Sequence, residues 1–370
     1  MNILWLTWKD HQHPEAGGAE VVLRQLSWRL RQDGHHVTWL TCGYPGAPAR
    51  QQLEGIDIIR VGSNRYLHSF QALAYYLKNL RGKYDVIIEV VNTAPYFGVF
   101  FGGKARGFLF YHQLARGIWF YETKPPLSQF GYFVFEPLAT RLLSRAPVKV
   151  ITVSESTRAD LIHYGFRPQN INIISEGFES KPAARLNAIK FPQPTILSFG
   201  AIRSMKRTMD QIEAFELAKK RLPDLQLIVA GNAAGPYGQQ VLARIRSSPF
   251  AADIQYLGKI NDAEKFRLMR RVHATMQTAL KEGWGITIIE AASQGTPAVV
   301  YDVDGLRDSV KHRQTGLVTE PKPAALAKAI VELLTDSMLY QRLRRAGWQW
   351  SKQLTFDRSY EQLKTILEVP

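Results

Sequence analysis

Short apolar runs alternate with segments of helical periodicity along the first half of the chain. Runs rich in Val, Ile, Leu and aromatic residues predict buried strands at NILWLTW (2–8), HHVTWLTC (35–42), YDVIIEVV (84–91), GFLFYH (107–112) and VKVITVS (148–154). Between the first two runs, residues 17–34 carry apolar side chains at helical spacing and end in Gly34, where a left-handed C-cap is expected. This alternation predicts a parallel α/β sheet.

The alternation stops at residues 176–194 and then resumes. That stretch has three prolines and little apolar periodicity, which is typical of a linker. Beyond it, a helix is predicted at 208–224, helices again run from about 323 to 369, and strands are predicted at PTILSFG (194–200), LQLIVAG (225–231), IQYLG (254–258), HATMQTAL (273–280), AVVYDV (298–303) and TGLVTEP (315–321). We therefore expect a second parallel α/β domain.

A chain of 370 residues exceeds the size at which one hydrophobic core usually stops growing. We predict two Rossmann-like domains, at 1–178 and 179–349, with residues 350–370 packing back on the first. Ligands of open α/β sheets bind beyond the carboxyl ends of the strands, so a cleft between the two sheets is the expected site. The loops PEAGGAE (14–20) and IRSMKR (202–207) are the ones expected to face it.

Cysteine content and the length of the apolar stretches indicate the cellular compartment of the protein. The single cysteine, Cys42, excludes an internal disulfide and is expected to be buried, which fits a reducing compartment. The first residues run into Lys9 and Asp10 too soon for a signal-peptide core. The most apolar stretch, at 95–103, is far shorter than the roughly 18 residues that span a bilayer. We expect a cytoplasmic protein without a membrane span.

The net charge of +15 indicates attraction to something anionic. Nucleic acid, phospholipid and phosphorylated ligands all qualify. The basic residues form only small scattered clusters, without an arginine-rich arm, a zinc-finger spacing or an RNA-binding aromatic motif. An anionic membrane face or a diphosphate ligand is therefore favoured over nucleic acid.

The stretch EGWGITIIEAASQGTPAVV (282–300) follows a predicted buried strand and begins a helix. The first amides of that helix, at Gly285, Ile286 and Thr287, favour a phosphate, and Gly283 and Gly285 let the backbone approach it closely. A carboxylate in the second turn can accept both hydroxyls of a ribose, and one ahead of the helix can reach hydroxyls beyond the phosphates. These acids are Glu290 and Glu282, with Trp284 between them. For an isolated pair, a solvated loop acid and an ordinary helix acid would be the alternative.

The signature E-G-[FW]-G-x4-E-A-x3-G-x-P-x-V in this stretch resembles that of the retaining glycosyltransferases of family four. The resemblance extends over nearly the whole chain, through residues 17–41, 150–166 and 199–215. It implies the GT-B fold, in which two Rossmann-like domains face each other across a cleft.

The resemblance implies roles for the acids and for the basic loop. Glu282 would hold hydroxyls of the donor sugar, Glu290 would bind the ribose, and Arg203 and Lys206 would neutralise the diphosphate as a metal does elsewhere. The family usually has arginine directly after the strand glycine, where this chain has Ala201. No metal and no other cofactor is implied, although DVDG (302–305) has the spacing of an Asp-x-Asp ligand pair.

The resemblance also points to residues outside the signature. Gly17 and Gly18 would lie against the diphosphate or the acceptor, or form only a tight turn. His112 would contact the primary hydroxyl of the donor sugar, or be a satisfied core histidine. Base recognition is expected at backbone near Gly258 and Lys259. The aromatic and basic stretch 112–122 would suit an acceptor with an apolar part, or be a packed surface loop.

The expected function is metal-independent transfer of a hexose from a nucleoside diphosphate sugar to a hydroxyl acceptor with retention. A UDP-sugar of the UDP-glucose type is favoured, on its frequency in the family. The acceptor would be a lipid-linked saccharide or polysaccharide, with the enzyme peripheral on the inner membrane face. A nucleotide-sugar epimerase or sugar phosphorylase, and a non-catalytic basic protein that binds membrane or nucleic acid, are the alternatives.

Overall fold

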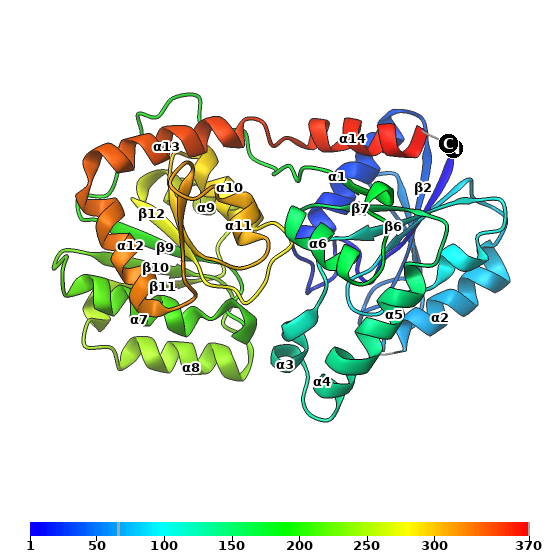
Figure 1. Ribbon diagram of the computed structural model, residues 1–370, viewed down its shortest axis with the longest axis horizontal. Coiled ribbons are helices and arrows are strands. Elements are labelled where there is room, and N and C mark those ends of the chain that lie inside the picture. The colour runs from blue at the N-terminus through cyan, green and yellow to red at the C-terminus, as the bar shows by residue number, and fades with distance from the viewer. Residues whose placement is uncertain (65–66, 369–370) are drawn as a thin grey trace. The chain divides into compact units, whose positions relative to one another are not determined.

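The computed structural model describes residues 1–64 and 67–368, so the predicted end of the last helix at residue 369 lies outside the described residues. The chain divides into two compact units (Figure 1). Unit 1 comprises Met1–Gly177 and the segment from Phe356 onward, and unit 2 comprises Phe178–Thr355. The predicted boundaries were 178/179 and 349/350. The whole of α13 (Ser337–Ser351), which crosses the second of these, belongs to unit 2.

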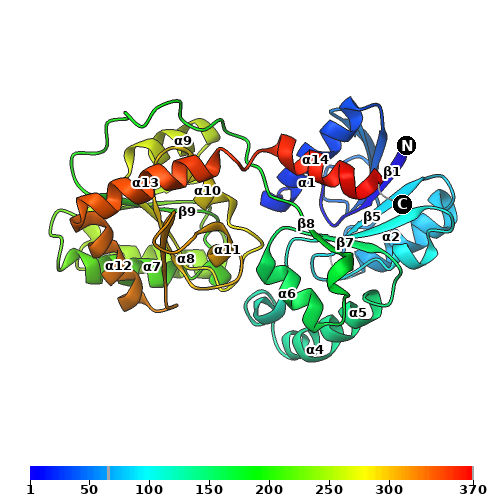
Figure 2. The ribbon, with the colours of Figure 1, turned by 45° about the horizontal axis from the view of Figure 1, so that its top comes forward.

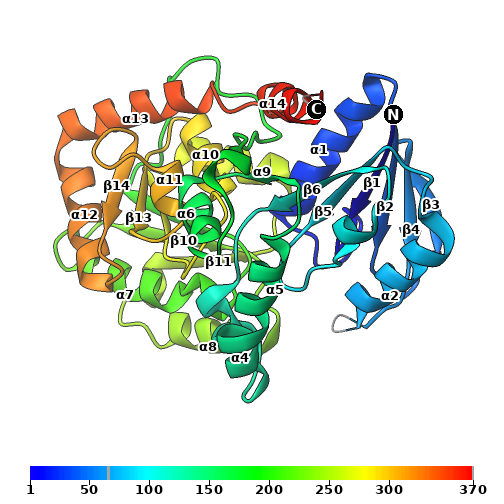
Figure 3. The ribbon, with the colours of Figure 1, turned by 45° about the vertical axis from the view of Figure 1, so that its right-hand side comes forward.

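The sheet of unit 1 has eight strands in the order β3-β4-β2-β1-β5-β6-β7-β8, of which Figure 3 labels β3 to β6 in this order. Five strands were predicted, and the bounds of all eight are Asn2–Leu6 (β1), His36–Thr41 (β2), Arg50–Leu53 (β3), Ile56–Arg60 (β4), Val86–Val90 (β5), Arg106–Tyr111 (β6), Lys149–Thr152 (β7) and Ile171–Ile173 (β8). All neighbours are parallel except β3 and β4, which form an antiparallel hairpin at the edge. The hairpin turn places Glu54 and Gly55 at positive φ.

Helices bury the sheet of unit 1. Their bounds are Gly18–Gln32 (α1), His68–Tyr75 (α2), Trp119–Glu122 (α3), Leu127–Phe130 (α4), Glu136–Leu143 (α5), Glu155–His163 (α6) and Phe356–Glu368 (α14). Helix α14 packs beside α1 (Figure 2), where Asp33 accepts hydrogen bonds from Tyr360 at 2.8 Å and Lys364 at 2.9 Å. Cys42 is buried, as expected.

The sheet of unit 2 has six parallel strands in the order β11-β10-β9-β12-β13-β14. They span Thr195–Phe199 (β9), Gln226–Ala230 (β10), Ile254–Gly258 (β11), Ala274–Gln277 (β12), Ala298–Tyr301 (β13) and Gly316–Thr319 (β14). Each lies within a predicted strand. Because β10 and β12 lie on opposite sides of β9, the strand order reverses there, and ligands of doubly wound sheets bind at such a reversal.

Helices cover both faces of this sheet, with bounds Thr208–Lys219 (α7), Gly235–Arg246 (α8), Asp262–Arg271 (α9), Ile286–Ser293 (α10), Leu306–Ser309 (α11) and Pro323–Thr335 (α12), followed by α13. Successive residues of β9 point to opposite faces, so Ile196 packs in one buried cluster with α7, α8 and α12, and Leu197 packs in another with α9 and α10. No helix in the described ranges 1–64 and 67–368 is long and apolar enough to cross a bilayer.

Candidate active site

Two loops of unit 2 meet where the strand order reverses. One follows β9 and ends in the 3₁₀ turn Ser204–Lys206, and the other follows β12 and leads into α10. A backbone hydrogen bond from Leu280 N to Met205 O, of 2.8 Å, ties them together. The sequence predicted both loops, and their contact follows from the pairing of β9 with β12.

An ion pair joins the ammonium of Lys206 to the carboxylate of Glu282. These are the two residues that the sequence assigned to the diphosphate and to the donor sugar. Both side chains are partly exposed, 22% and 16% of their surface, so a ligand can reach them. Each charge compensates the other.

Thr278 and Gln211 hold the Lys206 loop in place. The Thr278 hydroxyl lies 2.9 Å from Lys206 O and 3.0 Å from Arg207 O, and it accepts a hydrogen bond of 2.9 Å from Gln211 Nε2. Both side chains are buried. Because Arg207 takes a left-handed conformation, with φ of 53°, these bonds fix a turn that an L-residue rarely adopts.

Helix α10 begins at Ile286, directly after the N-cap Gly285, as predicted. Gly285 has φ of 83°, and a Cβ on it would meet Leu306 Cδ2 at 3.0 Å. Within the described residues, no side chain caps this helix start. The first amides of a helix have no acceptor within the helix, so those of Ile286 and Thr287 supply donors and the positive end of the dipole.

Glu290 lies in the second turn of α10, as predicted, but it is buried and paired. Its carboxylate is 2.7 Å from the ammonium of Lys265 on α9, a partner that the sequence did not predict. Burial raises the pKa of Glu290, and Lys265 opposes that shift. Lys265 therefore orients the carboxylate assigned to the ribose.

A third loop, between β13 and α11, contacts the backbone of Glu282. Glu282 N donates to Asp304 O at 3.0 Å, and a Cβ on Gly305 would lie 2.2 Å from Glu282 O. Burial favours the neutral form of Asp304, but Lys281 at 2.5 Å and then Arg307 keep its pKa below the ordinary value. The carboxylate of Asp302 pairs with Arg307 at 2.6 Å. The DVDG acids thus pair with side-chain cations.

The remaining residues assigned to the donor have different surroundings. Arg203 is exposed and begins the turn that contains Lys206. Gly283 is partly exposed beside Glu282, and Trp284 is buried with its indole nitrogen unpaired among the described residues. Gly258, at φ of 68°, accepts a hydrogen bond from Gly231 N at 2.8 Å, and Lys259 is exposed beyond it.

His112 belongs to unit 1, at the carboxyl end of β6, and it is buried against Glu176. The Nδ1–Oε1 distance is 2.9 Å. A carboxylate on Nδ1 makes this nitrogen the proton donor and leaves Nε2 as an acceptor. In the described part of the chain, Nε2 has no hydrogen-bond partner. Glu176 is the first residue of the predicted linker, and no feature of that stretch pointed to this role.

The two glycines after β1 open α1. Gly17 is the N-cap, in extended conformation, and its amide donates to Glu20 Oε2 at 2.7 Å. Gly18 is the first helical residue, so its amide belongs to the helix start. These residues and His112 lie in unit 1, whereas the other assigned residues lie in unit 2.

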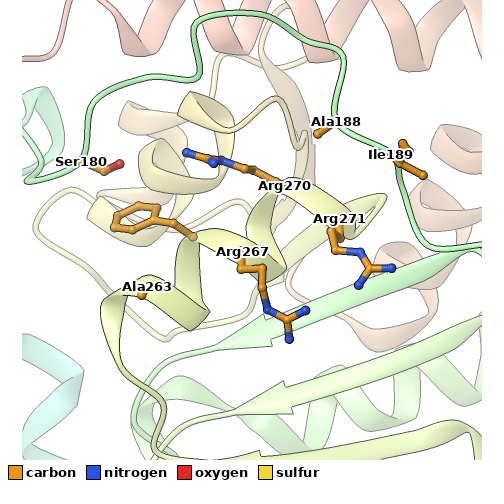
Figure 4. A pocket seen from close by; sticks show the side chains of 8 residues that line it. Ser180, Ala188, Ile189, Ala263, Arg267, Arg270 and Arg271 are labelled. Atoms are coloured by element: carbon orange, nitrogen blue, oxygen red, sulfur yellow. The ribbon is translucent and has the colours of Figure 1, made fainter.

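A hollow of unit 2, of about 680 Å³, lies between α9 and the segment 180–189 (Figure 4). Three arginines line it, but each already has a partner. Arg267 pairs with Glu264, Arg270 bonds Gln294 at 2.6 Å, and Arg271 stacks on Phe191. This hollow does not contain the assigned residues.

Solved structures with the same fold cover nearly the whole chain. Sucrose-phosphate synthase from Thermosynechococcus elongatus has a TM-score of 0.79 at 20% identity, with 99% of this chain and 98% of that chain covered. HepE from Anabaena, solved in complex with UDP-glucose, has a TM-score of 0.76 at 18% identity, with 99% of both chains covered. The two parallel-sheet units therefore define a GT-B protein.

Two family models cover most of the sequence. "Glycosyltransferase Family 4" matches residues 16–181, and "Glycosyl transferases group 1" matches residues 184–350. The chain belongs to the group 1 glycosyltransferases of family four, as the signature predicted.

Curated relatives share parts of the chain. D-inositol 3-phosphate glycosyltransferase of Jonesia denitrificans is 22% identical over 55% of this chain and 53% of its own length. Phosphatidyl-myo-inositol mannosyltransferase of Mycobacterium tuberculosis is 29% identical over 45% and 44%. Glycogen synthase of M. tuberculosis is 27% identical over 60% and 53%. The chain thus spans about half the length of these relatives.

Proposed function

We propose that this protein transfers a hexose from a nucleoside diphosphate sugar to a hydroxyl acceptor, with retention at the anomeric carbon. The observation that carries the proposal is the Lys206–Glu282 pair, between loops that meet where the strand order of unit 2 reverses. A cation for a diphosphate and an acid for sugar hydroxyls stand side by side there, ahead of the helix start at Gly285.

Cleavage of the bond between sugar and diphosphate develops negative charge on the leaving phosphate. Lys206, Arg203 and the amides of Ile286 and Thr287 would stabilise that charge, and fixed donors do so without reorganising during the reaction. We propose that these groups suffice without a metal. The acceptor would attack from the side that the diphosphate leaves, with a phosphate oxygen taking its proton, so no protein nucleophile is assigned.

Glu282 would orient the sugar by accepting its hydroxyl hydrogens once Lys206 turns to the phosphate. Glu290, held by Lys265, would bind the ribose. The backbone at Gly258 and Lys259 would contact the base, with Gly283 and Trp284 shaping the sugar pocket. For His112, the acceptor character of Nε2 suits the primary hydroxyl of the sugar. Gly17 and Gly18 would bind diphosphate or acceptor through the helix start.

UDP-glucose is the favoured donor, and its presence in the HepE complex supports trying it first. Several relatives bear the names of enzymes that glycosylate inositol lipids or glucans, which supports a glycolipid or polysaccharide acceptor. We propose that the enzyme acts in the cytoplasm at an anionic membrane face, because its net charge of +15 favours attraction to anionic lipids.

A thermal-shift series with UDP-, GDP- and ADP-sugars tests the donor. UDP-glucose is expected to raise the melting temperature more than UDP alone. Incubation with UDP-glucose and a panel of lipid-linked saccharides should then release UDP only when an acceptor is present, with the new bond in the donor's configuration by NMR. Interconversion of sugars without UDP release would indicate an epimerase, and salt-sensitive nucleic-acid binding without sugar-nucleotide affinity would indicate a binding protein.

A further inference from the structure

Exposed apolar side chains gather in one stretch of unit 1. Eight of the 18 large apolar side chains that are exposed in the described part of the chain fall within 23 consecutive residues, so they form a patch rather than the usual scatter. They are Phe120, Tyr121, Leu127, Phe130, Phe133, Val134, Leu138 and Leu142. We call the surface that they form on α3, α4 and α5 the aromatic face.

Most of the aromatic face lies along one helical rod. Helix α4, a π-helical turn at Gly131–Phe135 and α5 follow one another with helical backbone at each junction (Figure 1). The exposed residues Phe130, Val134, Leu138 and Leu142 recur every four positions. Side chains four apart on a helix are neighbours, so they form a stripe. Phe133, exposed to 66%, lies beside this stripe.

Buried contacts make the aromatic face rigid. A Cβ on Gly131 would come within 2.2 Å of the Trp119 ring, so α3 touches the rod at its backbone. The Phe120 ring contacts the Tyr132 ring at a tilt, with ring centroids 5.0 Å apart. The buried carboxylate of Glu136 accepts hydrogen bonds from the amides of Ala115, at 2.6 Å, and Arg116, at 2.7 Å. These contacts hold the exposed apolar side chains on an ordered backbone.

The charges around the aromatic face are mainly basic. Arg141 is exposed on α5 and, by helical spacing, lies on the same side as Leu138 and Leu142. Arg145 is exposed in the turn that follows α5. Lys124 is exposed between α3 and α4. Arg141 also lies over the Tyr164 ring at 5.9 Å, which leaves its charge in place. Of the two acids between residues 120 and 145, Glu136 is buried and only Glu122 is exposed.

We propose that the aromatic face docks on an anionic lipid bilayer, with Phe130, Phe133 and Leu138 among the acyl chains and the basic residues against the headgroups. Apolar side chains beside cations are what an interfacial segment requires, because burial and attraction to anionic lipid add. A second copy of this chain would set like charges against each other, which disfavours it as the occupant. Docking rests on the membrane location proposed above and names the surface responsible, whereas it does not depend on the transfer chemistry.

The test is co-sedimentation of the full chain with vesicles, without any sugar nucleotide. One set contains phosphatidylcholine alone, and the other adds about 30% phosphatidylglycerol. The test variant is Phe133→Ser with Leu138→Ser, and its matched control is Phe70→Ser, because Phe70 is in the same unit and is also exposed to 66%. A second variant, Arg141→Glu with Arg145→Glu, probes the charge.

The wild type is expected to sediment with the anionic vesicles. The Phe133/Leu138 variant should bind these vesicles at least about tenfold more weakly than the wild type, since each side chain loses its transfer into the acyl region. The arginine variant should lose the preference for anionic lipid, and Phe70→Ser should bind like the wild type. Thermal shift by UDP-glucose, measured on every variant, reports the donor site separately.

Three outcomes would overturn the proposal. The wild type could ignore anionic vesicles, the Phe133/Leu138 variant could bind as the wild type does, or Phe70→Ser could weaken binding equally. Size-exclusion chromatography identifies the competing occupant, because a dimer lost in the Phe133/Leu138 variant would assign the aromatic face to self-association.

Discussion

Lys206 and Glu282 form an ion pair although 76 positions separate them in the sequence. Adjacent strands, β9 and β12, bring them together, and the hydrogen bonds of Thr278 to the carbonyls of Lys206 and Arg207 keep the lysine loop in place. In the proposed reaction the pair opens: the ammonium turns to the diphosphate and the carboxylate to the sugar. Because the two side chains are assigned to different parts of the donor, substituting Lys206 should weaken nucleotide binding, whereas substituting Glu282 should lower the rate of transfer.

Glu282→Gln should lower transfer on the order of 100-fold, because the sugar loses its positioning group. The affinity for UDP should stay within a few-fold, since the amide keeps the size of the side chain and touches no phosphate. Initial rates with UDP-glucose and calorimetric titration of UDP separate the effects. Equal loss of UDP affinity and of rate would contradict the role.

Lys206→Ala should weaken UDP binding by about tenfold to 100-fold, since a charge-assisted bond to phosphate contributes about 1.5–3 kcal/mol. Binding of uridine, which lacks phosphate, should change little. Titrating both ligands into both proteins gives the comparison. An unchanged affinity for UDP would reject the assignment.

Gly305→Ala should disturb the site through Glu282, because the new Cβ would collide with the Glu282 carbonyl. Gly235→Ala is its control, since Gly235 also has positive φ, of 83°, in the same unit but has open space around it. The control should lose only the left-handed strain, about 1–2 kcal/mol. Gly305→Ala should lose more stability and also UDP-glucose affinity, as measured by thermal shift with and without ligand.

Glu176→Gln should lower transfer while leaving UDP affinity unchanged, because Glu176 sets the proton on His112 rather than touching the nucleotide. The amide can turn its own NH₂ group toward Nδ1 and so favour the other tautomer. His112→Ala should reduce the rate by a similar factor. A larger loss in Glu176→Gln, accompanied by a lower melting temperature, would indicate a structural role for this residue.

Lys190 predicts a pH dependence of stability. Burial, followed by repulsion from Arg344, lowers its pKa to about 7, although it still donates to Val272 O and Thr296 Oγ1. Between that value and the ordinary pKa of about 10.4, the unfolded chain binds the extra proton, so stability rises with pH. Relative to Lys190→Met, the wild type should gain about 2 kcal/mol from pH 7 to pH 9 in urea denaturation. A parallel response of both proteins would contradict this.

The predicted strands came from apolar runs, and the prediction missed β3, β4 and β8 of unit 1. In β4 (Ile56–Arg60, IDIIR), Asp57 and Arg60 interrupt the run of isoleucines. Strand β3 (Arg50–Leu53) is RQQL, half exposed at the sheet edge, and β8 has three residues, so neither carries an apolar run. The loop from Glu282 to Gly285 and the helix after it were predicted because glycine, acid and small residues follow one another there. Local sequence was enough in that case.

Partners that come from elsewhere in the chain could not be predicted. Lys265, Thr278 and Glu176 hold assigned residues, yet each is an ordinary polar residue in its own stretch. Only the sheet order brings Lys265 to Glu290, across α9 and α10. The left-handed turn at Arg207 could not be predicted either, because arginine is not a residue type that favours positive φ.

The return of the chain to unit 1 has a consequence for biosynthesis. Helix α14 buries Tyr360, Leu363 and Leu367, and its Gln362 accepts a hydrogen bond of 2.8 Å from Ser175 N. On the ribosome, all of unit 2 emerges before this helix does. The N-terminal unit therefore cannot complete its fold, and the side of α1 that α14 covers stays exposed, until α14 has been translated.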